Sequence, residues 1–343
     1  MRRLRAAVGV LLAVASASLL APAPAHAAGP ALERVSVCGT SLCVGTTPWA
    51  MKAVSIYGAM FDPGPAIAMA KEAGANTIRL TDFLQYGTPA QEAVASEEAW
   101  ARVDAVIATS AEAGLRVLLD LSPYRNLLTD DGLNPYVVDW TAYLTTAAAR
   151  VNTITGVAYR DDPTVALVSI AGEPLPPNGD PGPTVPTSRQ LTDFFTRTLA
   201  QWHALAPSTL VNVGGFLHHD WESGIEWERI MALPGNDVCA IHIYGHRSLR
   251  KGLPALADYC TELGKPWLME ETGVPQRIGD TARARWLSRV IAASWDLGAA
   301  GVGVWNIGGE TTDLVAGTYD VNPLTPRAWY AVQHGFARGP RRA

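Results

Sequence analysis

The sequence predicts a closed (β/α)₈ barrel, known as a TIM barrel, with a β-hairpin at its N-terminal end. Short apolar runs alternate with longer amphipathic segments along the chain, and eight such pairs can be counted. Strands that alternate with helices in this way favour a parallel sheet covered by helices. Several of the apolar runs end in charged or aromatic residues, which is typical of strands that open onto the mouth of a barrel.

The elements follow one another in a regular order. Expected strands cover residues 51–57, 76–80, 115–121, the run that begins at Val165, 210–213, 238–244, 266–271 and 301–305. Expected helices cover 65–73, 97–113, 137–151, 188–205, 224–233, 253–263, 281–297 and 326–336. No repeat or low-complexity tract interrupts this pattern, so we expect one catalytic domain from 28 to 343.

The first 27 residues have the composition of a secretory signal peptide. A basic start leads into a short apolar segment and then into Ala25-His26-Ala27, an A-x-A cleavage pattern. The apolar part is too short for a good membrane span, so we expect a secreted, extracellular protein without membrane attachment. The formal net charge of −5, without a basic stripe, argues against nucleic acid as a partner. We further expect a monomer.

Four cysteines are present, an even number that suggests disulfides in an exported chain. Cys38 and Cys43 flank Gly39–Leu42, which has the composition of a hairpin turn, so we expect them to pair. Cys239 and Cys260 would then form a second disulfide between a strand and the helix after it. Zinc coordination is the alternative, but the spacing does not resemble a zinc site.

Two carboxylates stand at the ends of two expected strands. The apolar run from Val165 ends in Gly172-Glu173-Pro174, and the run from Pro266 ends in Glu270-Glu271. Side chains alternate between the faces of a strand, so only one of the adjacent glutamates can face the mouth. Alternation alone does not decide which of the two it is. A pair of carboxylates on separate strand ends is what glycoside hydrolysis requires.

These motifs resemble those of glycoside hydrolase family 5, a family of retaining (β/α)₈ glycosidases. The segment 152–164, leading to Gly172-Glu173-Pro174, is similar to the endo-β-1,4-mannanase branch, as is the run from 265 to 273. The resemblance implies that Glu173 is the general acid/base and that Glu271 is the nucleophile. Glu271 would then face the mouth, and Glu270 would have a structural role. It also implies a polysaccharide or oligosaccharide substrate, and neither a metal nor another cofactor.

The same resemblance assigns supporting roles to four further residues. His242 and Tyr244 match the His-x-Tyr at the end of the sixth strand, and Arg79 matches an arginine beneath the nucleophile. Trp305 matches the tryptophan that forms the floor of the sugar subsite.

One residue departs from the family pattern. The family has asparagine before the acid/base, where it bonds the sugar 2-hydroxyl, and this chain has Gly172. We expect a slow enzyme, a different substrate, or a replacement side chain such as His218 or His219. His218, His219 and Trp221 follow the fifth expected strand, and Trp221 is a candidate wall of the sugar site.

The sequence leaves three functions open. Endo-β-1,4-mannanase is the first hypothesis, and a β-1,4-glucanase (cellulase) or an exo-β-mannosidase is the second. Gly172 also permits a carbohydrate-binding barrel with weak catalysis. For the enzyme, we expect repulsion between the two carboxylates to raise the pKa of Glu173, so that it can hold a proton near neutrality.

Overall fold

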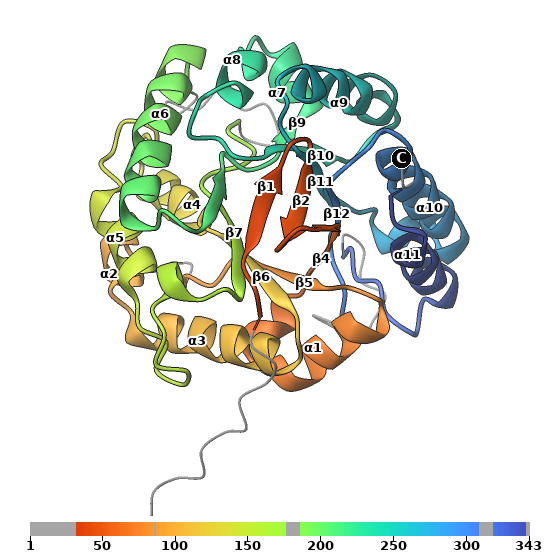
Figure 1. Ribbon diagram of the computed structural model, residues 1–343, viewed down its shortest axis with the longest axis horizontal. Helices are drawn as coiled ribbons and strands as arrows, with labels where there is room; N and C mark the ends of the chain where they lie inside the picture. The colour runs from red at the N-terminus through yellow and green to blue at the C-terminus, as the bar shows by residue number, and fades with distance from the viewer. Residues whose placement is uncertain (1–31, 86, 176–185, 309–317, 341–343) are drawn as a thin grey trace, which may run out of the picture.

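Parallel strands form a closed ring at the centre of the protein, and helices surround it (Figure 1). The computed structural model describes residues 32–85, 87–175, 186–308 and 318–340. Within these residues the central sheet contains β4 (Met51–Ser55), β5 (Thr77–Leu80), β6 (Arg116–Asp120), β7 (Val165–Ser169), β8 (Leu210–Asn212), β9 (Phe216–Leu217), β10 (Cys239–Ile243), β11 (Trp267–Thr272) and β12 (Gly301–Val304). The predicted (β/α)₈ fold is therefore confirmed.

The ring closes through a strand that is split in two. The sheet order is β8-β7-β6-β5-β4-β12-β11-β10-β9, so β8 and β9 are its two ends. These two strands are consecutive in the chain and are separated only by residues 213–215. Together they occupy the fifth of eight positions, with β8 paired to β7 and β9 paired to β10. The sequence predicted a strand over 210–213, which corresponds to β8, and did not predict β9 beyond Gly214 and Gly215.

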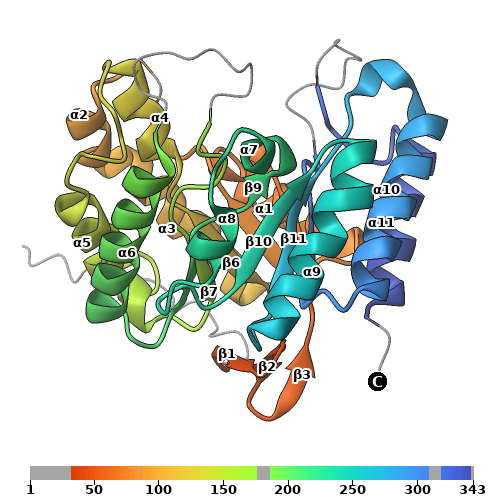
Figure 2. The same cartoon turned by 90° about the horizontal axis from the view of Figure 1, so that it is seen from above.

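Eleven α-helices lie within the described residues, and most of them form the outer layer (Figure 2). They are α1 (Pro63–Glu72), α2 (Ala90–Val94), α3 (Glu97–Glu112), α4 (Pro123–Asp130), α5 (Thr141–Ala149), α6 (Ser188–Leu205), α7 (His218–Glu222), α8 (Trp227–Met231), α9 (Leu253–Glu262), α10 (Asp280–Asp296) and α11 (Pro326–Arg338). Local signals start several of them. Thr187 and Gln190 form a capping box at α6, and Ser96 accepts the N–H of Ala99 at α3.

A small antiparallel sheet covers one end of the barrel. It consists of β1 (Val35–Cys38), β2 (Ser41–Val44) and β3 (Thr47–Trp49), one strand more than the predicted hairpin. Val35 and Leu42 are buried in one apolar cluster with Met51 and Leu118 of the barrel strands. Figure 2 shows this sheet at the end of the barrel away from α4 and α7. It therefore seals the N-terminal ends of the strands and leaves the opposite end for the site.

Both predicted disulfides are present. Cys38 and Cys43 join β1 to β2, and Cys239 and Cys260 join the first residue of β10 to α9. The second bridge closes the longer loop, with a sequence separation of 21 against 5, and so constrains the unfolded chain more.

Two sequence predictions need comment. No helix was expected between the third barrel strand and residue 137, but Pro123 begins α4. A proline is suited to the first turn of a helix, because the N–H that it lacks would have no partner there. The predicted signal peptide, residues 1–27, lies outside the described residues. No helix among those described is long and apolar enough to cross a membrane.

Candidate active site

A pocket of about 240 Å³ opens at the carboxyl ends of the barrel strands. Its lining includes Arg79, Asp120, Arg125, Gly172, Glu173, His242, Glu271 and Trp305. These residues come from six different strand ends and from the first turn of α4. The pocket thus collects the carboxylates that the sequence assigned to the mouth of the barrel.

Glu271 is held by two donors at the end of β11. Arg79 Nη1 and the Tyr244 hydroxyl each donate a short hydrogen bond to its carboxylate, which is almost fully buried. Burial and the charge of Glu271 raise the pKa of Tyr244 well above its ordinary value, so the phenol stays protonated and remains a donor. Both donors favour an ionised and fixed carboxylate.

Glu270 and Glu271 do not follow the strict alternation that the sequence predicted. In the ladder with β10, Ile241 pairs with Met269 and His242 pairs with Glu271, so Glu270 is an extra residue in a β-bulge. A bulge turns neighbouring side chains toward one side of the strand. As a result Arg79 contacts both carboxylates, with its Nε 3.9 Å from Glu270 Oε1.

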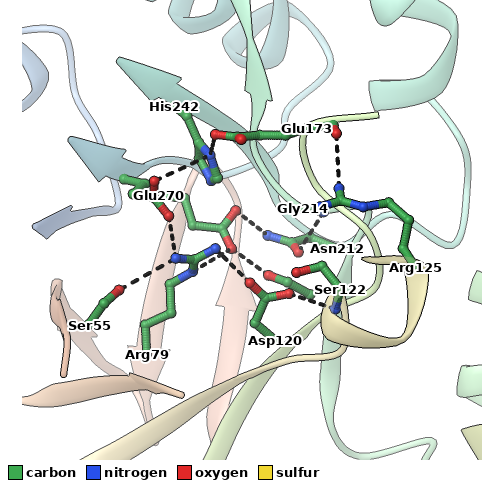
Figure 3. A network of polar contacts seen from close by, with 12 residues as sticks. Ser55, Arg79, Asp120, Ser122, Arg125, Glu173, Asn212, Gly214, His242 and Glu270 are labelled. Atoms are coloured by element: carbon green, nitrogen blue, oxygen red, sulfur yellow. Dashed lines mark hydrogen bonds and ion pairs between the residues drawn. The ribbon is translucent and has the colours of Figure 1, made fainter. Parts of the chain in front are cut away.

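The bulge requires a glycine on the neighbouring strand. A Cβ on Gly303 would lie 2.0 Å from the carbonyl oxygen of Glu270, which is closer than any side chain permits. The Glu270 side chain meanwhile accepts the Ser169 hydroxyl and lies 3.5 Å from Asn212 Nδ2. Its structural role is therefore supported, and Arg79 joins it to the site (Figure 3).

Glu173 is held through its backbone. Its φ of 50° lies in the left-handed region, which is rare for a residue with a side chain and persists only where the surroundings fix it. Its N–H donates to the carbonyl of Gly215 at 2.9 Å, and its own carbonyl accepts Arg125 Nη1 at 2.9 Å. The carbonyl of Pro174 accepts the Tyr136 hydroxyl at 3.2 Å. These contacts aim the side chain into the pocket.

His242 links the two carboxylates. Its Nδ1 lies 2.6 Å from Glu173 Oε1 and 3.9 Å from Glu271 Oε1 (Figure 3). Burial alone would lower the pKa of His242, but the negative charges of Glu271 and Glu173 raise it to about 9. At neutral pH the imidazole is therefore protonated and donates to Glu173.

Repulsion between the two carboxylates was expected to raise the pKa of Glu173, but this prediction is wrong in direction. Burial raises it, but the hydrogen bond and charge of His242, together with Arg125 and Arg79, lower the pKa of Glu173 below its ordinary value. Burial, with the charge of Glu173, raises the pKa of Glu271. The sequence argument considered only the two carboxylates and left out the cation between them.

Gly172 is fixed by close packing between strand ends. A Cβ there would lie 2.8 Å from the carbonyl oxygen of Gly215, and a Cβ on Gly215 would lie 2.0 Å from the His242 ring. The three-residue interruption between β8 and β9 therefore passes directly against Gly172 and His242. This position has no room for an asparagine without displacing that segment.

Trp305 follows β12 and lines the pocket, as the resemblance implied. Its ring packs edge-to-face against Tyr57, with centroids 5.0 Å apart. The Arg79 guanidinium lies 5.7 Å from the same ring centroid, so this arginine contacts an aromatic face as well as the carboxylates. An indole held in this way offers a rigid apolar surface to a sugar.

Glu173, His242 and Glu271 also have the spacing of a metal site, since one ligand atom from each lies within 4.8 Å of the others. Those atoms already have partners, however. His242 donates to Glu173, while Arg79 and Tyr244 donate to Glu271. The cations that balance the carboxylates are thus the protein's own.

Some predicted site residues lie elsewhere. His218 and Trp221 are not among the residues that line the pocket, and their rings pack on each other 5.4 Å apart. Trp221 also stacks on Trp227 at 4.0 Å between centroids, which places it in a side-chain cluster on α7 and α8. His219 is likewise absent from the lining. Neither histidine therefore replaces the asparagine that the family has at the position of Gly172.

Other pocket residues were not found by the sequence reasoning. Asp120 accepts Arg79 Nη2 at 2.6 Å and the Ser122 N–H at 2.9 Å, which fixes the guanidinium from below. Arg125 reaches Glu173 from α4. Asp120 could have been found as a carboxylate at the end of an apolar strand. Arg125 could not, because its place depends on a helix that the sequence did not predict.

Known proteins resemble this chain in sequence. A family model described as Cellulase (glycosyl hydrolase family 5) matches residues 41–309. A mannan endo-1,4-beta-mannosidase of Oryza sativa subsp. japonica is 22% identical over 317 residues, covering 75% of this chain and 83% of the relative.

Solved structures agree on the fold. The endo-1,4-beta-mannanase from Rhizomucor miehei superimposes with a TM-score of 0.71 at 18% identity, covering 89% of this chain and all of that one. The catalytic domain of an endoglucanase from Thermobifida fusca gives 0.59 at 19% identity, covering 89% and 97%.

Proposed function

Because the chain belongs to glycosyl hydrolase family 5 and is thus a glycoside hydrolase, we propose that it cleaves β-1,4-linked mannan with retention of configuration. In this proposal Glu271 is the nucleophile and Glu173 is the general acid/base. One observation carries the mechanism. A carboxylate oxygen of Glu173 lies within 4.8 Å of one of Glu271.

That separation favours retention over inversion. Retaining glycosidases place the two carboxyl groups roughly 5–5.5 Å apart, whereas inverting enzymes need about 6.5–9.5 Å to admit a water between carboxylate and sugar. Two carboxylate oxygens within 4.8 Å of each other favour the shorter of these separations. A carboxylate this close to the other can reach the anomeric carbon itself.

In the first step Glu271 attacks the anomeric carbon and forms a glycosyl ester as the glycosidic C–O bond breaks. Glu173 transfers a proton to the departing oxygen, so the leaving group departs as a neutral hydroxyl. Arg79 and Tyr244 keep Glu271 anionic and oriented until it attacks. Trp305 supports the face of the sugar.

The proton for this step comes from the pair formed by His242 and Glu173. Because the pKa of His242 is raised and that of Glu173 is lowered, the proton rests on His242 Nδ1, 2.6 Å from Glu173 Oε1. A transfer along this hydrogen bond gives a protonated Glu173 and a neutral imidazole without changing the net charge of the three groups. Substrate that excludes water from Glu173 favours the neutral carboxyl and draws the proton across.

The second step reverses the roles. Glu173, now ionised, removes a proton from a water that attacks the anomeric carbon, and the ester to Glu271 breaks. While the ester exists Glu271 carries no negative charge, so the pKa of His242 falls, because Glu271 is the first of the groups that raise it.

Mannan is proposed as substrate because a curated relative at 22% identity is named as a mannan endo-1,4-beta-mannosidase. The family description and the endoglucanase neighbour keep β-1,4-glucan as the second candidate. The two sugars differ in the orientation of the 2-hydroxyl, and Gly172 offers no side chain to select between them.

We also propose that the protein is secreted and acts as a monomer. The N-terminal segment, residues 1–27, has the composition of a signal peptide. Both disulfides fit an oxidising environment.

The test is hydrolysis of linear mannan and of mixed-linkage β-glucan, with the anomeric form of the first product read by proton NMR. We expect release from mannan, a β-anomer as the initial product, and no release by Glu271→Ala. Release of sugar mainly from glucan would support the proposed mechanism but make β-glucan the substrate. An initial α-anomer would overturn retention, and sugar binding without turnover would make the protein a binding barrel.

A further inference from the structure

A groove lies between α10 and α11 on the outside of the barrel, away from the pocket just described. The two helices lie side by side in both views (Figures 1 and 2). The groove is open and has a volume of about 860 Å³. The lining residues that matter here are Arg285, Ser288, Arg289, Arg327, Tyr330 and His334.

The groove is strongly basic although the chain is acidic. Three arginines line it, and the described lining contains no aspartate or glutamate, whereas the chain as a whole carries a formal net charge of −5. Arg285 and Arg289 are exposed and form no ion pair with any described residue. Both stand on α10, four residues apart, so their guanidinium groups lie on one face of the helix.

Acids near the groove already have partners. Asp280 accepts the backbone N–H groups of Arg327 and Ala328 and so caps the start of α11. Asp296 pairs with Arg338 at 2.5 Å, at the far end of the two helices. Neither carboxylate neutralises Arg285 or Arg289, so the positive charge of the groove is not balanced from within.

An aromatic surface accompanies this charge. Tyr330 is 65% exposed, and its ring stacks on His334 with centroids 5.8 Å apart and an angle of 29° between the planes. The pair presents a flat face in a groove that is otherwise cationic. Flat rings match the C–H face of a pyranose, while guanidinium groups match carboxylates through paired hydrogen bonds.

We propose that this groove is a second carbohydrate-binding site, which holds an acidic polysaccharide bearing carboxylate groups. A neutral mannan or glucan has no use for three arginines. Proteins that bind single-stranded nucleic acid combine a positive groove with several aromatic platforms, one for each successive base, and the described lining offers a single exposed tyrosine.

The position of the groove suits an enzyme that acts on polymers. α10 and α11 follow β11 and β12, so their first residues lie at the same end of the barrel as the active-site pocket. Arg327 is in the first turn of α11 and marks that end of the groove. An acidic chain bound here would be held beside the mouth. This binding does not depend on the mechanism proposed for the two glutamates.

The experiment is affinity electrophoresis in native gels that contain polygalacturonate, compared with gels that contain neutral glucomannan. The variant Arg285→Gln/Arg289→Gln removes two charges from the groove. The control Arg189→Gln/Arg229→Gln removes two exposed arginines from α6 and α8, and thus the same net charge. Hydrolysis of a short soluble substrate and the melting temperature report whether each variant is folded.

We expect polygalacturonate to retard the wild-type protein and the control alike, and the groove variant to lose at least tenfold in apparent affinity. Tyr330→Ala should lose affinity at unchanged net charge. Binding should weaken as salt is added, because the contacts are exposed charges. Equal loss in the control, equal retardation by glucomannan, or tighter binding of single-stranded DNA with the same dependence on Arg285 would each overturn the proposal.

Discussion

The ends of β7 and β11 each supply one carboxylate to the pocket, but they fix it by different means. At β11, a bulge leaves Glu270 out of the ladder and brings Glu271 onto Arg79 and Tyr244. The constraint on Glu271 is therefore made by side-chain donors. Those donors act on the carboxylate itself and hold its two oxygens in place.

At β7 the constraint is made on the backbone. Glu173 has a φ of 50°, and its own peptide groups bond Gly215 and Arg125. Tyr136 holds the next residue by donating to the carbonyl of Pro174. Its side chain is 28% exposed and has one bonded partner of its own, His242. The carboxylate is thus aimed but remains free to exchange a proton.

This difference suits the two roles we propose. A nucleophile must stay ionised and at a fixed distance from the anomeric carbon, and side-chain donors achieve both. An acid/base must change its protonation state twice in each cycle, so rigid donors on both oxygens would work against it. The contrast can be tested by removing each constraint separately.

The largest effect should come from the β11 end. Glu271→Gln keeps the shape and hydrogen-bonding capacity but removes the nucleophile, so we expect kcat on mannan oligosaccharides to fall by roughly 10⁴-fold or more. Glu270→Gln is the matched control, because it is adjacent, equally buried and bonded to Ser169. Its loss should be far smaller. Equal losses would mean that the bulge had been assigned to the wrong glutamate.

Next in size is the β7 end. Glu173→Ala should lower kcat by roughly 10²–10⁴-fold on natural substrates, the range for a missing general acid/base. A substrate with an activated leaving group needs no proton in the first step and should lose less. Added azide should then restore turnover in the Ala variant and yield a β-glycosyl azide. Glu173→Gln, which fills the space, should not respond, and a response from both variants would contradict the assignment.

The sequence predicted the fold well because its strongest signals are repeated and local. Apolar strands, helix caps and the turn between Cys38 and Cys43 are each visible within a few residues. The helix from 188 to 205 was predicted with its observed bounds, since Thr187 and Gln190 form a capping box there. The failures occur where a strand is interrupted, as at Gly214 and Gly215. Helix and strand propensities do not reveal which segment of the chain packs against a glycine.

The site was predictable only in part for the same reason. Glu173 and Glu271 stand at the ends of apolar runs, so carboxylates could be expected at these strand ends. The choice of Glu271 over Glu270 needed the family pattern. Arg125 acts from a helix that depends on Pro123 starting a new element. The proton balance also needs distances, because His242 lowers the pKa of Glu173 only by lying 2.6 Å away. A sequence without coordinates cannot decide which charge lies nearest.

The third prediction concerns pH and follows from His242, which links the carboxylates at the ends of β7 and β11. His242 has a pKa of about 9, raised from its ordinary value, so the proton shared with Glu173 is present below about pH 9 and lost above it. His242→Gln leaves Glu173 as sole carrier of that proton. The basic limb of kcat/KM should therefore move from near pH 9 to lower pH, and kcat should fall on the order of 10²-fold. A basic limb that stays in place would separate His242 from proton transfer.

The smallest effect should come from the backbone constraint itself. Arg125→Met removes the bond to the Glu173 carbonyl, and a hydrogen bond from a charged donor is worth ~1.5 kcal/mol, which is about tenfold in kcat. Arg125 is also one of the charges that lower the pKa of Glu173, so its loss raises that pKa and moves the basic limb of kcat/KM to higher pH.

Arg125→Lys separates these two effects. Lysine keeps the positive charge but cannot bond the Asn126 side chain through two nitrogens, as Arg125 does with Nε and Nη2. The basic limb should stay near its wild-type position while kcat still falls. If both variants change KM alone, Arg125 binds substrate and does not position Glu173. In that case the strained backbone at β7 would be held by Gly215 and Tyr136 without help from α4.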